Sequence, residues 1–383
     1  MSEAIEQLRA RARGVGEESA DALEQIDELE DEARGALTAL ASAELLGWTV
    51  PHRDGGAESG GLAPDDQVSV RALCAVRDEL AYHSGMLDVM FVMQGLGSYA
   101  VARGGGEELR AQVLPGVAAG QQIAAFALTE PEAGSSLTDV STRAERTTSG
   151  WRLTGRKTFI SNVPLAHFYS VLARTSGEPG DKDGLTMFFV PGDAWGLDVT
   201  PFDVIAPHLI GDVVLEDCEI PAAFLLGEEG RGLDLALATL ARFRTSVAAA
   251  ACGFARRALD ESRRRLRERV QFGKPLAANQ GLRFDLAEMD TRLRAAQLLT
   301  DEAAALSDED DDGAPLAVAR AKLFATETAG YVCDRAVQHF GGLGVKRGTL
   351  VERLYREVRA LRIYEGTSEV QKLIIGKAVL DRP

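Results

Sequence analysis

The hydrophobic pattern of this 383-residue chain changes its period twice. Apolar residues recur at three- and four-residue spacing in "LCAVRDELAYH" and again in "ALATLARFRTSVAAAACGFARRALDESRRRLRERV", as along the buried face of a helix. Between these segments, "FYSVLART", "GLTMFFVPG" and "DVVLEDCEIP" are short β-branched and aromatic runs bounded by turn residues. We predict an N-terminal helical domain over residues 1–119, a β domain over 120–228 and a C-terminal helical domain over 229–383. Because no long helices separate the strands, we expect an antiparallel barrel or sandwich.

Composition excludes several classes of protein. The N-terminal segment is rich in Glu, Asp and Arg and lacks the apolar run of a secretory signal, and no stretch approaches the roughly 20 apolar residues that span a bilayer. The net charge of −16 and pI near 4.9 argue against non-specific nucleic-acid binding. We therefore predict a cytoplasmic protein with no membrane or nucleic-acid partner.

Several short motifs resemble known binding sites without meeting their requirements. The segment "GLGSYA", Gly95–Ala100, fits a dinucleotide fingerprint but follows a run of helical spacing, and no acidic residue lies 20 positions later. The glycine-rich "FGGLGVKRG" lacks the Lys-Ser/Thr ending of a phosphate loop. The histidines form no HExxH motif, and the four cysteines lie far apart without metal-ligand spacing. We predict no metal site. We interpret the cysteines as small buried hydrophobic residues; they are Cys74, Cys218, Cys252 and Cys333.

Two segments have strongly biased charge. The basic run Arg256–Lys274 is either a solvated helix face or a contact surface for a polyanion. The acidic tract Ser307–Gly313 lacks the ligand spacing of a calcium loop, so we expect a solvated turn between two helices.

Four longer segments resemble the flavoprotein acyl-CoA dehydrogenase family. They are "FALTEPEAGSSLTDVSTRAERTTSGWRLTGRKTFISN", "EDCEIPAAFLLGEEGRG", "RERVQFGKPLAANQGLRFDLAEM" and "AVQHFGGLGVKRGTLVERLYREVRALRIYEGTSEVQKLIIGK", and they follow one another in the family's order. The resemblance implies an α+β multidomain fold with an N-terminal helical domain, a middle antiparallel β-barrel and a C-terminal four-helix bundle. It also implies FAD as cofactor, held between the β-domain and the bundle.

The resemblance assigns cofactor-binding residues in both regions. In the β-domain, the positions matching those around the isoalloxazine ring and flavin phosphates are Phe126, Leu128, Thr129, Ser135, Phe159 and Ser161. In the bundle, the positions matching contacts to the ADP half of FAD across a subunit interface are Arg269, Phe272, Gln280, Gln338, Gly341 and Gly342. Thr367 matches a hydroxyl near the flavin diphosphate. These assignments imply a homodimer or homotetramer.

Glu365, in "IYEGTSE", matches the family's catalytic base. The resemblance implies that Glu365 takes the α-proton of an acyl thioester while the β-hydrogen leaves as hydride to flavin N5. It places Ser135, Arg244, Tyr364 and Gly366 at the substrate. Gly366 lacks Cβ, which permits a sharp bend, and partial burial would raise the pKa of Glu365 toward that of a working base. The alternative is that Glu365 only begins the final helix, whose first turn favours acids.

The sequence departs from the family pattern at places that concern the acyl carrier. Ser136 stands where Asp is common, "PHLIGDVVLED" lacks the usual Ser and Thr, and Phe243 replaces an acid or Thr. The substrate is therefore either an acyl-CoA or an acyl-carrier protein, as in a biosynthetic member, whose acidic carrier would meet the basic residues Arg263–Arg267. The alternative activities are a flavin-dependent oxidase or hydroxylase and a non-catalytic acyl-thioester-binding protein. The family also implies electron-transfer flavoprotein as the acceptor.

Overall fold

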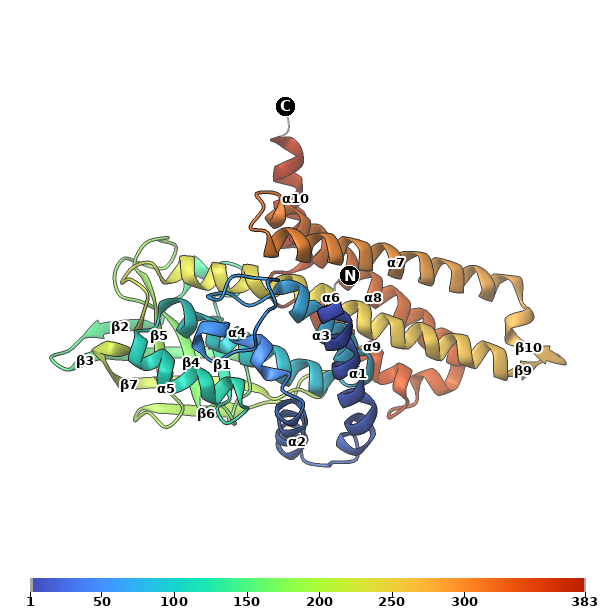
Figure 1. Cartoon of the computed structure of the whole chain (residues 1–383), viewed down its shortest axis with the longest axis horizontal. Helices are drawn as coiled ribbons and strands as arrows, with labels where there is room; N and C mark the ends of the chain where they lie inside the picture. The colour runs from blue at the N-terminus through green and yellow to red at the C-terminus, as the bar shows by residue number, and fades with distance from the viewer. Residues whose placement is uncertain (1–2, 382–383) are drawn as a thin grey trace. The chain divides into compact units, whose positions relative to one another are not determined.

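The computed structural model describes residues 3–381 of the chain (Figure 1). Along the sequence, helices are followed by strands and then by helices again, which confirms the predicted order. The chain divides into two compact units. The first unit contains residues up to 17, residues 74–88 and residues from 244 onward, and the second contains residues 18–73 and 89–243.

The second unit is built on an eight-stranded sheet. Its strands are β1 (Ala124–Ala127), β2 (Arg143–Arg146), β3 (Gly150–Ser161), β4 (Phe168–Arg174), β5 (Leu185–Pro191), β6 (Leu197–Pro201), β7 (Ile210–Pro221) and β8 (Leu225–Leu226). Its helices are α2 (Leu29–Ser42), α5 (Glu107–Ala118) and all but the first turn of α4 (Gly85–Gly104). It also contains the end of α1 (Glu3–Leu23) and the first parts of α3 (Val70–His83) and α6 (Gly232–Glu268).

The strand order is β6-β7-β3-β2-β4-β5-β8, with β1 added beside β4. The sheet is mixed rather than wholly antiparallel as expected, because β1 and β2 both pair with β4 in parallel. The β2–β3 hairpin separates β1 from β4 in sequence, so the chain re-enters the sheet in the same direction. Strand β4 is buried along its whole length, and Trp151 packs edge-on against Phe188 with ring centroids 5.1 Å apart. A strand covered on both faces is apolar throughout, as "FYSVLAR" nearly is.

The first unit is a helical bundle. Its helices are α7 (Gln280–Asp308), α8 (Ala314–Phe340), α9 (Leu350–Leu361), α10 (Ser368–Leu380) and parts of α1 (Glu3–Leu23), α3 (Val70–His83) and α6 (Gly232–Glu268). A small hairpin, β9 (Val270–Gln271) with β10 (Lys274–Pro275), connects α6 to α7. Alanine dominates the core, so helices such as α7 and α8, side by side in Figure 1, pack closely. The acidic tract spans the α7–α8 turn, as predicted.

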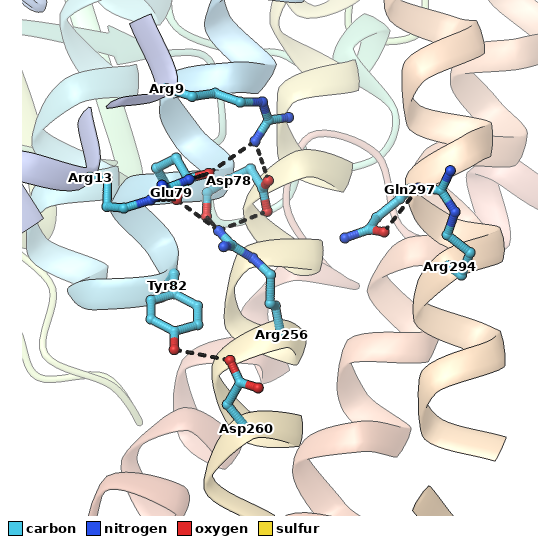
Figure 2. Close-up of polar contacts among 9 residues, drawn as sticks. All are labelled: Arg9, Arg13, Asp78, Glu79, Tyr82, Arg256, Asp260, Arg294 and Gln297. Carbon is cyan, nitrogen blue, oxygen red and sulfur yellow. Dashed lines mark hydrogen bonds and ion pairs between the residues drawn. The ribbon is translucent and has the colours of Figure 1, made fainter. Parts of the chain in front are cut away.

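A buried network of charges joins α1 to α3 and α6 (Figure 2). Glu79 accepts hydrogen bonds from Arg9 at 3.2 Å, from Arg13 at 3.2 and 3.3 Å and from Arg256 at 3.1 Å. Asp78 accepts a further bond from Arg9 at 2.6 Å. Burial alone would raise the pKa of Glu79, but the arginines outweigh it and the pKa is lowered. The network therefore stabilises the bundle while Glu79 is ionised.

Other arginines of the basic run on α6 are also paired with acids, whereas Arg265 lies over the Phe340 ring. Arg257 lies 3.5 Å from Glu261, which also binds Arg264, and Arg263 lies 3.1 Å from Asp260. These i,i+3 and i,i+4 pairs neutralise much of the positive charge that a polyanion would meet. They favour the solvated-face interpretation of this segment.

Two helices within residues 3–381, α4 and α6, are long and apolar enough to cross a membrane, which the sequence analysis did not anticipate. Buried residues make up 89% of the apolar window of α4 and 67% of that of α6, as in the core helices of a folded domain. The "GLGSYA" segment lies within α4, which confirms that it is not a dinucleotide fingerprint. All four cysteines are free and buried, as predicted.

Candidate active site

Glu365 lies in the connection between α9 and α10 and has a left-handed backbone. Its φ is 51°, and that of the next residue, Gly366, is 93°. Positive φ costs a residue with a side chain about 1–2 kcal/mol, so surrounding contacts must hold this conformation. Thr367 is the N-cap of α10, and its hydroxyl accepts a hydrogen bond from the Val370 amide at 3.2 Å. Because α10 begins at Ser368, the alternative that Glu365 merely starts the final helix is wrong.

Three side chains of the bundle hold the carbonyl groups of this connection. Arg244, on α6, donates through Nε to the Glu365 carbonyl at 2.8 Å. Lys322, on α8, donates through Nζ to the Gly366 carbonyl at 2.7 Å, and Gln371 donates to the same oxygen at 3.0 Å. Two consecutive carbonyls are thus fixed by donors from three helices. These bonds offset the strain of the left-handed backbone.

The carboxylate of Glu365 is placed to act as a base. Its Oε2 is buried and has no hydrogen-bond partner among the described residues. Burial raises the pKa of Glu365 above its ordinary value, and the positive charges of Arg77, Arg244 and Lys322 oppose that rise. A desolvated carboxylate with a raised pKa is a stronger proton acceptor than one in water.

A buried ion pair between Arg77 and Asp88 affects the pKa of Glu365 through its charges. The sequence did not suggest this pair. Arg77 donates to both carboxylate oxygens of Asp88, at 2.8 and 2.7 Å, and to the Ser246 hydroxyl at 2.9 Å. Among the positive charges that oppose the rise in the pKa of Glu365, that of Arg77 has the largest effect. Tyr364 as a whole residue is 39% exposed, whereas burial of its hydroxyl raises the pKa of that group.

Four of the predicted cofactor residues line one cavity of about 510 Å³. The cavity lies at the C-terminal ends of α6 and α8. The four residues are Arg269, Gln338, Gly341 and Gly342. Arg265 adds a second guanidinium to the lining. Gly341 has φ 63°, and a Cβ on either glycine would meet no atom within 4 Å, so the backbone is open to a ligand here. Such an arrangement suits a phosphate or a nucleotide.

The other two predicted bundle residues do not line this cavity. Phe272, in the β9–β10 turn, is 98% exposed with φ 51°, and Gln280 is the exposed first residue of α7. The hairpin therefore presents a large apolar side chain to solvent rather than to its own bundle.

In the second unit, five predicted residues lie on β3 and along β1 and its continuation. Phe126 and Leu128 are buried, and the Thr129 carbonyl accepts from the Thr158 amide at 2.9 Å, which ties the two segments together. Phe159 has φ 55°, and its ring is 59% exposed. An exposed aromatic ring on a bulged strand is available to stack on a planar ligand.

The remaining predictions in this unit have mixed outcomes. The hydroxyl of Ser161 is 2.8 Å from Nε2 of His208, a partner that the sequence did not suggest, and burial lowers the pKa of His208 to about 4. His208 is therefore neutral at physiological pH. Ser135 is exposed in a loop before β2. Phe243 is fully buried against Tyr99, with ring centroids 5.7 Å apart, as an apolar side chain should be.

Fold and site together define an oxidoreductase of the acyl-CoA dehydrogenase class. Models of the N-terminal, middle and C-terminal domains of acyl-CoA dehydrogenases match residues 2–121, 125–218 and 230–380. The chain therefore belongs to the acyl-CoA dehydrogenase family.

Individual relatives agree over nearly the whole chain. Cyclohexane-1-carbonyl-CoA dehydrogenase of Geobacter metallireducens is 34% identical over 98% of this chain and 96% of its own length. The structure of butyryl-CoA dehydrogenase from Megasphaera elsdenii superposes with a TM-score of 0.90 at 30% identity, covering 99% of each chain. An acyl-CoA dehydrogenase from Bacillus anthracis complexed with FAD has a TM-score of 0.89 at 26% identity, covering 99% of this chain and 68% of the other.

Proposed function

We propose that this protein catalyses FAD-dependent α,β-dehydrogenation of an acyl thioester, with Glu365 as the base. The observation that carries the proposal is the buried, unpartnered Oε2 of Glu365 on a backbone held by Arg244 and Lys322. A structural glutamate would pair this oxygen, because an unsatisfied buried carboxylate is costly. A group that must accept a proton from a ligand needs it free.

The residues present fit FAD. The glycines and guanidinium groups of the 510 Å³ cavity suit the ADP half, and Phe159 with Ser161 suits the ring. When bound, FAD supplies the two-electron acceptor that a dehydrogenation requires. The chain's own part is to orient the acyl group, exclude water and remove the α-proton at Glu365. By the family pattern, the Glu365 amide would polarise the thioester carbonyl.

Further assignments belong to the same proposal. The roles of Ser135, Tyr364, Gly366 and Thr367 follow the family resemblance. The domain limits 1–119, 120–228 and 229–383 follow the hydrophobic periodicity of the sequence. We propose acyl-CoA as the substrate ahead of an acyl-carrier protein, since acids pair with Arg257, Arg263 and Arg264 of the basic run. The proposal also includes a cytoplasmic location and a homodimer or homotetramer whose subunits meet near Phe272. It further includes re-oxidation of the flavin by electron-transfer flavoprotein.

The proposal is tested with the purified protein and a panel of acyl-CoA and acyl-carrier-protein thioesters. We expect a yellow protein whose flavin absorbance bleaches anaerobically with one class of thioester. A flavin that substrate bleaches and that oxygen then re-oxidises rapidly, with release of hydrogen peroxide, would instead indicate an oxidase, and one that only an external reductant bleaches would indicate a hydroxylase. A protein that takes up no FAD would contradict the proposal and leave the non-catalytic alternative.

Glu365→Gln should retain FAD and lose substrate-dependent bleaching by about 10²–10⁴-fold, the usual contribution of a general base. Stopped-flow absorbance of the variant with the best thioester measures this loss. Glu369→Gln is the matched control, because Glu369 lies in the first turn of α10 with a side chain 76% exposed. Bleaching by Glu365→Gln at the wild-type rate would place the base elsewhere.

A further inference from the structure

Lys322 is a buried lysine whose place in the proposed reaction has not been assigned. It lies in the middle of α8, has no exposed surface, and its Nζ reaches the Gly366 carbonyl at 2.7 Å. A lysine is almost never fully buried unless its charge is satisfied. Apolar residues line the neighbouring α8 positions, so packing alone would be served better by leucine or methionine. Packing alone therefore does not explain why a lysine occupies this position, and we look for the explanation in its contact with Gly366.

We propose that Lys322 is a positioning residue for the base: its ammonium group clamps the Gly366 carbonyl and so fixes the left-handed turn from which the Glu365 carboxylate projects. The inference rests on the proposed function of Glu365. Arg244 performs the matching task one residue earlier, at the Glu365 carbonyl. Two cationic donors from α6 and α8 thus hold the two successive peptide groups that follow the Cα of Glu365, which fixes the turn directly after the base.

The charge of Lys322 acts on the carboxylate as well. Lys322 is one of the three cations that oppose the raised pKa of Glu365, the others being Arg77 and Arg244, while Asp88 acts in the opposite direction. Loss of the Lys322 charge removes part of this opposition. The pKa of Glu365 would then rise further, and a smaller fraction of it would be ionised at neutral pH.

Lys322 differs from the arginines because it can lose its proton in an accessible pH range. Burial lowers its pKa to about 8, against the charges of Glu365, Glu327 on α8 and Glu369 on α10, while Arg244 on α6 acts with burial. The ammonium is present below that pH and is lost above it. The pH–rate profile should therefore be bell-shaped, with an acidic limb from Glu365 and an alkaline limb from Lys322.

The test compares Lys322→Arg and Lys322→Met in the FAD-loaded enzyme by measuring kcat and KM from about pH 6 to about pH 10. Lys322→Met should lower kcat about 10- to 100-fold, as a misplaced catalytic group does, with little change in KM, and should shift the acidic limb upward. Lys322→Arg should recover activity and lose the alkaline limb, because arginine stays charged. The control, Lys372→Met, removes an α10 lysine that is 61% exposed and should leave the profile unchanged.

Gln371→Leu provides a second route if the Lys322 variants fold poorly. It removes the other donor to the Gly366 carbonyl, at 3.0 Å, and carries no charge. We expect a lower kcat with the alkaline limb still in place. A Gln371→Leu enzyme with wild-type kcat would contradict the clamp, because loss of this bond would then leave the base where it was.

Stability gives a readout independent of catalysis. Between the lowered pKa near 8 and the ordinary value of 10.5, the unfolded chain binds a proton at Lys322 that the folded chain has released. Folding stability contributed by this group therefore rises with pH across that window, and Lys322→Arg loses the rise. The Tm of the wild type minus that of Lys322→Arg should increase over this range, and a constant difference would overturn the titration.

The outcomes separate this inference from the proposed function. If Glu365→Gln abolishes bleaching while Lys322→Met retains wild-type kcat and the alkaline limb, the clamp is wrong and the base assignment stands. If Glu365→Gln is active, the proposed function itself has failed.

Discussion

At the scale of single residues, Glu365 and Gly366 show how far a local motif predicts structure. The need for glycine after the glutamate follows from a sharp bend, and its φ of 93° confirms that need. The left-handed conformation of Glu365 itself does not follow from the motif. It depends on Arg244 and Lys322, which are 121 and 43 positions away in sequence, so only the folded bundle brings them to the turn.

Gly366→Ala should destabilise the protein by about 1–2 kcal/mol, because alanine at positive φ is strained. Its Cβ would also lie 2.6 Å from the Gln371 Nε2 that holds the turn. We expect a lower Tm by thermal denaturation and a reduced kcat at full FAD occupancy.

Gly376→Ala is the matched control. Gly376 lies within α10, its φ is not positive and an added Cβ meets nothing within 4 Å. Alanine should raise helix stability there by up to about 1 kcal/mol. Equal losses in the two variants would show that the turn at Gly366 imposes no special demand.

At the scale of elements, helices and strands followed the sequence pattern, whereas their pairing did not. The strands β4 and β5 were predicted from their apolar runs, but the parallel pairing of β1 and β2 with β4 was missed, since strand direction depends on the route of the chain and not on local periodicity. The charge network was missed for a similar reason. Arg9, Glu79 and Arg256 belong to three separate helices. The sequence of each helix alone predicts that its charged residue lies on the surface.

Glu79→Gln should lower the free energy of unfolding by about 2 kcal/mol, because three arginines lose a charged acceptor while Asp78 still pairs with two of them. Its side chain is 3% exposed. The contribution of Glu79 is fully present above the ordinary carboxyl pKa of 4.5 and is lost as the pH falls below that value through its lowered folded pKa. Urea denaturation at neutral pH and at about pH 3 should therefore show a difference between wild type and variant that shrinks in acid.

Glu268→Gln controls for the loss of an acid on α6. Its side chain is 66% exposed and lies 3.7 Å from Arg264. The change should stay within about 0.5 kcal/mol. A Glu79→Gln protein as stable as this control would mean that the network contributes no net stability.

At the scale of the whole molecule, the predicted sequence of helical, β and helical regions and the family assignment are both confirmed. Of the predicted bundle residues, Arg269, Gln338, Gly341 and Gly342 converge on one cavity. Phe272 and Gln280 do not line this cavity, and both are exposed. The sequence identifies these two residues only through a motif. The folding of one chain gives no reason for their exposure.

Removal of FAD should lower the Tm of the protein. A ligand at 100 times its Kd stabilises the folded state by about 2.7 kcal/mol, and adding FAD back should restore the Tm in proportion to its logarithm. FMN lacks the ADP half, so it should restore less if the cavity at Gly341 holds that half. Equal protection by FMN and FAD would remove this cavity from the cofactor site.

The burial of all four thiols gives the protein an internal reporter of its own opening. A thiol reagent reaches these sulfurs only when the surrounding structure separates, so its reaction rate measures the population of opened molecules. Cys218 belongs to the sheet unit, and Cys74, Cys252 and Cys333 belong to the bundle unit. Labelling followed by peptide mapping would thus show, without any added probe, which half of the enzyme loosens first under heat or denaturant.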